Sequence, residues 1–230
     1  MLAPPPIGST RQLGEAVADA IVDAVAQGSL QPGERIVEAD LAGQLGVSRV
    51  PIREAIKILQ AQGILEVTPN RGARVVAFEG RIIEDVFEAR VALERIAIRG
   101  AVLAYRLAPR RLDALREIIS RMQRMASWSD WVEFRKCDVA FHHEICKASG
   151  NSIVLKLWEA LARHITIIFG RELASERNFD LVIEQHEALL RQIEAGNPQI
   201  EDTLERHILR LRKPAGRQAH VGKRMARSTR

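Results

Sequence analysis

The chain has 230 residues and a formal net charge of +5, and 47% of its residues are hydrophobic, enough to bury a core in each of two domains. It has no run of 18 or more apolar residues, and its start, MLAPPPIGSTRQ, lacks the basic and apolar regions of a signal peptide; both features exclude a membrane protein and predict a cytoplasmic one. Cys137 and Cys146 lie too far apart on one predicted helix for a disulfide, which excludes a disulfide-stapled scaffold.

The positive charge is concentrated at the C-terminus. Residues 210–230 contain eight lysines and arginines and no acidic residue, so the rest of the chain is slightly acidic. We expect residues 213–230 to form a disordered basic tail that adds at most nonspecific affinity for DNA. Net charge therefore gives no argument for DNA binding, and only the placement of charge in the N-terminal part can give one.

Two helices and a turn are predicted before residue 47. The first helix covers about residues 10–27 and has apolar residues on one face, and the second covers Glu38–Leu45. Pro32 and Gly33 predict a turn between them. Gly46 then stands at a tight turn into a third helix, which is the pattern of a helix-turn-helix.

The third helix, Ser48–Gly63, sorts its residues into two stripes. Apolar side chains recur at i, i+3, i+4 and i+7, and basic ones at i, i+4 and i+8 on another face. Ser48 stands at the N-cap position and Gly63 just past the end. One face should pack and the other should face nucleic acid. The apolar stripe is Ile52, Ala55, Ile56 and Leu59, and the basic stripe is Arg49, Arg53 and Lys57.

A β-hairpin is predicted directly after this helix. Residues 64–68 and 73–76 read as strands, and residues 69–72 (PNRG) read as the turn that joins them. A hairpin in this place is a wing. Three helices followed by a wing predict a winged helix-turn-helix domain.

Residues 30–76 resemble the winged helix-turn-helix of the GntR family of bacterial transcription regulators. The phrases PGER, DLA, LGVSR.P.REA and NRG.RV stand at the family's spacing. The resemblance implies that Arg49 and Arg53 contact DNA bases or phosphates and that Ser48 supports them. Val50 replaces a threonine that is frequent in the family, which implies an altered operator preference. The implied DNA-binding residues are Ser48, Arg49, Val50, Arg53, Arg71 and Gly72, the last two of which place the wing against DNA.

After a hinge at residues 78–81, the chain is predicted to be entirely helical. Six amphipathic segments with short breaks predict an antiparallel all-α bundle. The fold class is therefore mainly α, with a winged helix-turn-helix domain over residues 1–78 and an all-helical six-helix bundle over residues 79–212. The six predicted helices cover residues 81–105, 109–126, 129–149, 151–170, 175–196 and 198–212.

Four residues of the bundle could bind a metal ion. Asp138 and His142 lie at i, i+4 on one predicted helix, and His186 and His207 come from the last two helices. Three imidazoles and a carboxylate would suit a divalent transition metal such as zinc, nickel or manganese. Spacing alone leaves a simpler alternative open, in which Asp138 and His142 form an exposed ion pair.

The bundle also resembles a known domain. The phrases FEARVALE (87–94), DVAFHHEI (138–145) and EQHEALL are similar to the ligand-binding FCD domain of the FadR branch of the GntR family, and six helices point to its VanR-like variant. In metal-binding members an Asp and three His coordinate the ion, which implies Asp138, His142, His186 and His207 as ligands here. His143 and His164 match no motif position and are interpreted as surface or packing residues.

Arg90 and Glu94 lie at i, i+4 on the first bundle helix. They could form a simple intrahelical salt bridge. The resemblance supports a second interpretation, in which Arg90 faces the pocket and binds the carboxylate of an effector. Both interpretations stay open. The three tryptophans, Trp128, Trp131 and Trp158, are interpreted as core or helix-interface residues.

Together these features predict a homodimeric transcription regulator, a repressor that binds a palindromic operator in double-stranded DNA and senses a small organic acid. One alternative is a metal-dependent hydrolase that uses the same Asp and His residues. Another is a bundle that only dimerises. The sequence shows no nucleophile arrangement and no glycine-rich phosphate loop, and the DNA-reading domain argues against an enzyme.

Overall fold

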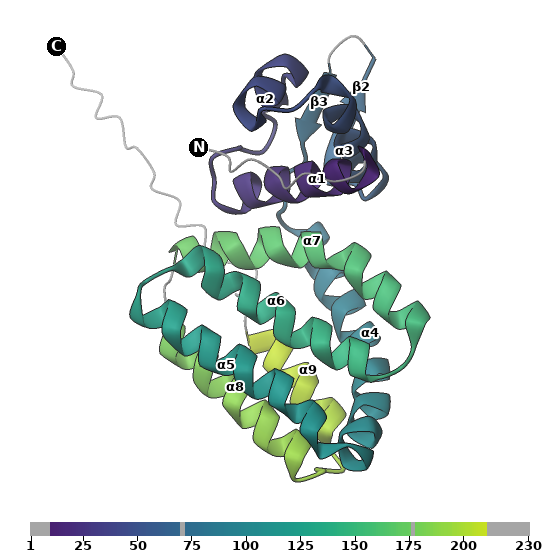
Figure 1. Cartoon of the computed structure of the whole chain (residues 1–230), viewed down its shortest axis with the longest axis vertical. Coiled ribbons are helices and arrows are strands. Elements are labelled where there is room, and N and C mark those ends of the chain that lie inside the picture. Colours follow the sequence, from purple (N-terminus) through teal and green to yellow (C-terminus); the bar gives the residue numbers. More distant parts are fainter. Residues whose placement is uncertain (1–9, 70–71, 176–177, 211–230) are drawn as a thin grey trace, which may run out of the picture.

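The computed structural model describes residues 10–69, 72–175 and 178–210. A small N-terminal domain lies on one end of a larger helical bundle (Figure 1). In the described ranges, no helix is long and apolar enough to cross a membrane. The N-terminal elements are α1 (Thr10–Ala26), β1 (Arg35–Ile36), α2 (Glu38–Leu45), α3 (Arg49–Ala61), β2 (Leu65–Thr68) and β3 (Gly72–Val75).

The apolar stripe of α3 forms the centre of the N-terminal core, as predicted. Ile52, Ala55 and Leu59 are fully buried, and α3 packs against α1 and α2. Glycines end the two helices of the helix-turn-helix: Gly46 follows α2 with φ of +66°, and Gly63 follows α3 with φ of +72°. These left-handed positions favour glycine because it has no Cβ.

The wing is a three-stranded antiparallel sheet in the order β1-β3-β2. The predicted hairpin is present as β2 and β3, with Leu65 opposite Val75. The third strand, β1, replaces part of the predicted turn and pairs Arg35 with Arg74. A strand of two residues is too short to show an alternating pattern in the sequence. It is recognised only from its pairing with β3.

All six predicted bundle helices are present. The first is α4, and a 3-10 turn at Pro109–Arg111 precedes α5. The longest differences from the predicted ends are at α7, which extends past residue 170, and at α8, which begins at Phe179. The central helix α6 packs against α4, α5 and α7. The helices are α4 (Arg81–Leu107), α5 (Leu112–Ser127), α6 (Trp131–Ala148), α7 (Ser152–Ser175), α8 (Phe179–Glu194) and α9 (Ile200–Arg210).

One tryptophan is not where it was expected. Trp158 is buried in the bundle and Trp131 is half-buried, but the side chain of Trp128 is 69% exposed. Trp128 caps the C-terminal end of α5 at the corner that leads to α6. Its interpretation as a core or helix-interface residue is therefore wrong, because the corner between α5 and α6 leaves it largely exposed.

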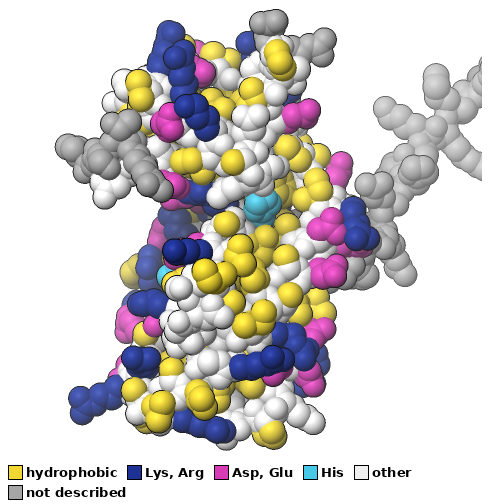
Figure 2. Space-filling view, turned by 90° about the vertical axis from the view of Figure 1, so that its right-hand side faces the viewer, with side chains coloured by type: hydrophobic (Ala, Val, Ile, Leu, Met, Phe, Trp, Pro, Cys, Tyr) yellow, Lys and Arg dark blue, Asp and Glu magenta, His cyan; other side chains and the backbone are white. Residues whose placement is uncertain are grey.

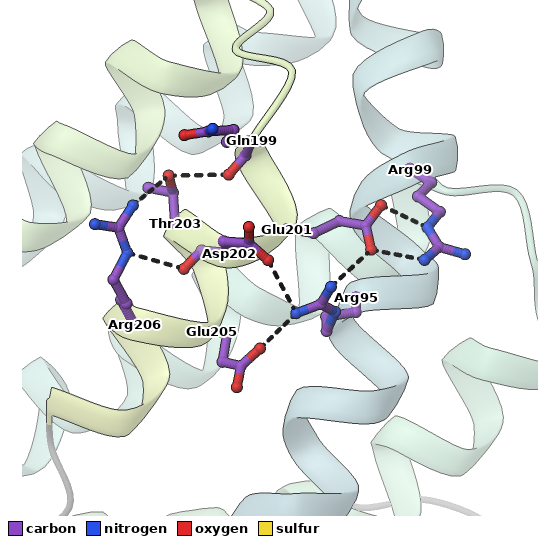
Figure 3. A network of polar contacts seen from close by, with 8 residues as sticks. All are labelled: Arg95, Arg99, Gln199, Glu201, Asp202, Thr203, Glu205 and Arg206. Atoms are coloured by element: carbon purple, nitrogen blue, oxygen red, sulfur yellow. Dashed lines mark hydrogen bonds and ion pairs between the residues drawn. The ribbon is translucent and has the colours of Figure 1, made fainter.

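The helix α9 is fastened to α4 by charged side chains (Figure 3). Arg99 forms two hydrogen bonds to Glu201, of 2.6 and 2.7 Å, and Arg95 pairs with Glu201, Asp202 and Glu205. Such exposed pairs contribute little singly and more as a network. They hold α9 in register beside α4.

The two domains meet where α1 lies along α7. Arg163 of α7 binds Glu15 and Asp19 of α1, at 2.5 and 2.9 Å. Arg135 of α6 is fully buried and binds Asp23 of α1 at 2.7 Å. The N-terminal domain is thus joined to α6 and α7 by ion pairs as well as by the covalent hinge.

Candidate DNA-binding surface and buried histidine centre

The outer face of α3 offers a small set of side chains to solvent. Arg49 and Val50 are exposed at the start of the helix, with Val50 at 55%. Arg53 is exposed too, and its Nε lies 2.9 Å from Glu38 of α2, which holds the guanidinium beside the turn. Ser48 occupies the predicted N-cap position, but its side chain makes no capping hydrogen bond. Its hydroxyl is therefore free for another partner.

The wing adds a second basic position. The predicted wing residue Arg71 lies outside the described residues. Gly72 opens β3 with φ of +80°, and a Cβ there would come within 3.1 Å of the Arg35 Nε. Arg35 therefore lies directly against the wing. Sequence reasoning missed this residue because it took the segment as a turn, although Arg35 stands inside the quoted PGER phrase.

The bundle core contains a cluster of polar side chains without access to water. They come from four helices: α4, α6, α8 and α9. Each is at most 5% exposed. The cluster comprises Arg90, Glu94, Asp138, His142, His186 and His207. The alternative of an exposed Asp138–His142 ion pair is therefore wrong, because both side chains face the interior.

Glu94 is the hydrogen-bond acceptor that organises one side of the centre. Its Oε1 accepts from Arg90 Nε and from Trp158 Nε1, each at 2.9 Å, and its Oε2 accepts from His142 Nδ1 at 2.6 Å. Burial alone would raise the pKa of Glu94, but the adjacent His142 and Arg90 lower it to about 2. Glu94 is thus a carboxylate, and His142 carries its proton on Nδ1.

The same reasoning fixes the orientation of a second imidazole. His186 Nδ1 lies 2.8 Å from the carbonyl oxygen of Val182, which can only accept, so Nδ1 carries the proton. Burial lowers the pKa of His142, so its ring is neutral. His142 and His186 therefore each turn Nε2 toward the centre. Ligand nitrogens of His142, His186 and His207 all lie within 4.8 Å of one another.

Several buried polar atoms at this point have no hydrogen-bond partner among the described residues. They are both carboxylate oxygens of Asp138, Nε2 of His186 and Nη2 of Arg90. Asp138 Oδ1 lies 3.2 Å from His186 Nε2. Either a proton on Nε2 or a cation must lie between these two atoms, because a carboxylate oxygen and an imidazole lone pair repel each other. Leaving such atoms unpaired is costly, so the arrangement indicates a missing group.

A divalent cation fits these residues. Two ligands about 2.1 Å from a common ion are roughly 3.0–3.5 Å apart, and Nε2 of His142 lies 3.1 Å from Nε2 of His207. The carboxylates of Glu94 and Asp138 outnumber the one guanidinium of the centre, that of Arg90. Burial raises the pKa of Asp138, but His186, Arg90 and His142 bring it well below its usual range, so it is a carboxylate.

The surroundings of Arg90 leave little room for the effector carboxylate that it was predicted to bind. Its guanidinium binds Glu94, and its Nη2 lies 3.7 Å from Asp138. The cavity beside it has a volume of only about 10 Å³, room for one water molecule at most. An effector carboxylate would reach Arg90 only by displacing one of these partners.

The interpretation of His143 and His164 as surface or packing residues is confirmed. His143 is at the surface beside Glu159, and His164 packs against Phe78 and binds the carbonyl oxygen of Gln62. Cys146 is fully buried, and burial raises the pKa of its thiol far above its usual range. It behaves as a small apolar group.

Comparisons with known proteins agree with this architecture. Residues 13–75 match the family model "Bacterial regulatory proteins, gntR family", and residues 85–210 match the FCD domain. The "Probable D-xylose utilization operon transcriptional repressor" of Paenarthrobacter nicotinovorans is 32% identical over 84% of both chains. The "Nta operon transcriptional regulator" of Aminobacter aminovorans is 33% identical over 68% of this chain and 71% of that protein.

Solved structures show the same fold. E. coli McbR/YncC superposes with a TM-score of 0.75 and 25% identity, covering 86% of this chain and 94% of that one. A GntR-type regulator from Rhodococcus sp. RHA1 gives a TM-score of 0.67 at 20% identity, covering 85% and 93%.

A winged helix-turn-helix joined to an all-helical FCD domain defines a transcription regulator, and not an enzyme. The chain belongs to the GntR family of bacterial regulatory proteins, with an FCD domain at its C-terminal side. The hydrolase alternative is wrong, because the relatives and the structural neighbours are transcription regulators.

Proposed function

We propose that this protein is a homodimeric repressor that binds a palindromic DNA operator and is controlled by a small organic acid sensed in a metal-containing bundle. The single observation that carries the metal and sensing part is the convergence of His142, His186 and His207 in the buried core, beside the unpaired carboxylate of Asp138. Zinc, nickel and manganese are the ions that this mixed imidazole and carboxylate set favours.

Repression is the direction that the relatives support. The name of one relative describes a repressor of a D-xylose utilization operon, and another, 26% identical, is a gluconate operon transcriptional repressor of Bacillus licheniformis. Both names concern operons for organic nutrients. Repression relieved by a metabolite is the simplest regulation of such operons, and it is the regulation we propose here.

A homodimer is supported by an exposed apolar surface. Figure 2 shows hydrophobic side chains gathered on the side of the bundle where α4 and the start of α7 lie in Figure 1. A single recognition helix reads only a few base pairs, so a second copy on this surface would supply the second half-site. The exposed large apolar side chains of these two helices are Ile82, Ile96, Leu103, Leu107, Ile153 and Leu157.

The helix α6 offers a route from the sensor to the reading domain. It carries Asp138 and His142 into the buried centre, and one turn earlier it carries Arg135 to Asp23 of α1. A bound divalent ion would supply a fixed positive charge that holds the ligand residues and attracts an acid. An effector changes operator affinity only by binding one arrangement of the two domains better than the other. Because α6 contributes residues both to the buried centre and to the contact with α1, a shift of α6 would change both.

Metal content tests the proposal directly. Purified full-length protein should contain close to one equivalent of metal per chain by elemental analysis. A variant with both Asp138→Ala and His142→Ala should lose it, while His143→Ala, which changes the neighbouring exposed histidine, should keep it. Equal metal content in the double variant and the wild type would refute the centre.

The regulatory part needs operator DNA, which selection from a random pool with the wild-type protein would provide. Addition of a saturating effector should then change the affinity for that DNA. Operator affinity that stays constant with every acid that binds the protein would contradict regulation by an effector.

A further inference from the structure

Two arginines stand opposite each other on the solvent face of the wing. Arg35 of β1 and Arg74 of β3 are direct partners in the antiparallel ladder, and both side chains are exposed. Partners of this kind point to the same face of a sheet, and like charges placed directly opposite destabilise it. Glu66 of β2 is the partner of Arg74 on its other side, but neither arginine forms an ion pair within the described ranges. This face therefore carries positive charge that the described residues do not neutralise.

The two guanidinium groups point to opposite ends of the sheet. Arg74 Nη1 donates to the carbonyl oxygen of Gly33 at 2.6 Å, and the Gly33 N–H donates to Val75 at the end of β3. Arg35 extends the other way and lies over Gly72, the first residue of β3. Arg74 is thus tied back at the base of the wing, whereas Arg35 reaches toward the end of the sheet where the chain passes from β2 to β3.

Gly72 provides the space in which the Arg35 guanidinium lies. A Cβ at Gly72 would stand 3.1 Å from Nε and 3.6 Å from Nη2 of Arg35, so a larger residue would push the guanidinium away from the strand. The φ of +80° at Gly72 also favours glycine. The sequence therefore holds Arg35 in an extended position along the wing instead of leaving it without a defined place.

This end of the wing is open to a large partner. The strands β2 and β3 lie on the side of α1 that faces away from the bundle (Figure 1), so the bundle does not cover them. Figure 2 shows several basic side chains at the same end of the domain. The outer face of α3, with Arg49 and Arg53, belongs to this domain as well. A polyanion that contacts α3 and the wing together would meet Arg35.

We propose that Arg35 is a further DNA-contacting residue, whose guanidinium binds a backbone phosphate beside the wing. This inference rests on the proposed function, since Arg35 can contact DNA only if the domain binds DNA. A guanidinium presents its N–H donors in a planar fork that matches the oxygens of a phosphate. A phosphate at this place also offsets the repulsion between Arg35 and Arg74. Such a contact fixes the register of the protein on the duplex and carries no sequence information.

A phosphate contact has two signatures that a base contact lacks. It releases condensed counterions from DNA, so its loss makes binding less dependent on salt. It also acts on every sequence, so its loss weakens operator and unrelated DNA alike. A contact to a base edge would instead favour one sequence over another.

The test measures DNA affinity as a function of salt. Full-length wild-type protein and Arg35→Gln are titrated by fluorescence anisotropy with an operator selected from a random pool and with an unrelated duplex of equal length. Over about 50–200 mM KCl, the slope of log K against log salt should become shallower by about one per bound chain in Arg35→Gln. The affinity at the lowest salt should fall roughly three- to tenfold on both duplexes.

Two matched variants separate this contact from general effects of charge. Arg74→Gln removes the same charge from the same face of the sheet, but its guanidinium is tied to Gly33, so the salt dependence should stay as in the wild type. Arg35→Lys keeps the charge without the fork and should keep the slope. Thermal unfolding should show no loss of stability in Arg35→Gln, because the substitution removes one of two opposed like charges.

The outcomes distinguish this contact from DNA binding itself. A wild-type protein that binds no DNA refutes the proposed function and this inference with it. Wild-type binding that Arg35→Gln matches in affinity and slope overturns the contact and leaves DNA binding by the domain intact. Equal losses in Arg35→Gln and Arg74→Gln would show a general effect of charge and overturn the assignment to Arg35. A loss confined to the selected operator, at unchanged slope, overturns the phosphate contact in favour of a base.

Discussion

Arg135 and Asp138 lie on adjacent turns of α6 and serve different domains. Arg135 binds Asp23 of α1 at 2.7 Å, whereas Asp138 lies 3.2 Å from His186 inside the bundle. Any displacement of α6 that follows from occupation of the centre therefore acts on a buried ion pair to the DNA-reading domain. This relationship leads to the first prediction.

Arg135→Met should uncouple the two domains. The variant keeps an unbranched apolar stem in place of the arginine and leaves the metal ligands unchanged, so it should bind Ni²⁺ as the wild type does. Coupling free energies between sites are typically about 1–3 kcal/mol, and we expect the Ni²⁺-dependent change in affinity for a selected operator to fall to less than about twofold. Lys147→Met, on the exposed face of α6, is the control and should keep the full change. An unaltered response in Arg135→Met would exclude this route.

Glu94→Gln should weaken both the fold and the metal site. The substitution keeps the size of the side chain but removes the charge that balances buried Arg90 and orients His142. Breaking a buried pair costs about 3–5 kcal/mol, and loss of a partner of a metal-binding histidine reduces metal affinity about 10–100-fold. Denaturant unfolding and Ni²⁺ titration measure the two effects. Glu88→Gln, on the exposed face of α4, should change neither, and a metal affinity unchanged in Glu94→Gln would remove Glu94 from the site.

The metal-free protein should lose stability in acid. The pKa of Glu94 is about 2 in the folded state, whereas an unfolded glutamate titrates near ~4.3. A carboxyl group whose pKa is lower in the folded state than in the unfolded state stabilises the fold. Its full contribution to the free energy of unfolding is present above the unfolded-state pKa and is lost as the pH falls toward the folded-state pKa. The free energy of unfolding should therefore fall by about 3 kcal/mol between pH ~4.3 and ~2 on account of this group.

Chemical unfolding at a series of pH values, with a chelator present, measures this dependence. Asp138 should contribute to the loss of stability in acid in the same direction, because the fold also lowers its pKa. Glu94→Gln should show a correspondingly shallower dependence. Parallel curves for the variant and the wild type would contradict the assignment of a low pKa to Glu94.

Arg49→Ala should reduce operator binding without changing stability. The side chain is exposed at the start of α3 and belongs to the outer stripe, so no packing is lost. A contact to a base or phosphate is worth about 1–3 kcal/mol, which corresponds to a loss of roughly 5–150-fold in affinity. Gel shifts at fixed salt measure the loss, and thermal unfolding verifies the fold. Wild-type affinity in this variant would remove Arg49 from the DNA-binding surface.

The sequence predicted those parts of the structure that depend on local periodicity. The two stripes of α3, the hairpin of the wing and the six bundle helices all follow from the spacing of apolar residues within one segment. The histidines were found because Asp138 and His142 share a helix face and because the FCD resemblance supplied His186 and His207. Spacing alone could not have shown that all four are buried.

Features that depend on contact between distant segments were missed. The strand β1 exists only through its pairing with β3, and Arg35 reaches the wing only because of that pairing. Glu94 joins Arg90 to His142 because α4 packs on α6, and nothing in either helix alone indicates this.

The two stripes of α3 share no residue. The apolar stripe packs against α1 and α2, while Arg49 and Val50 are exposed to solvent. Substitutions on the outer face can therefore accumulate without a cost in stability. In evolutionary terms, the operator that this protein reads is free to diverge while its architecture stays fixed, so one scaffold can serve different genes.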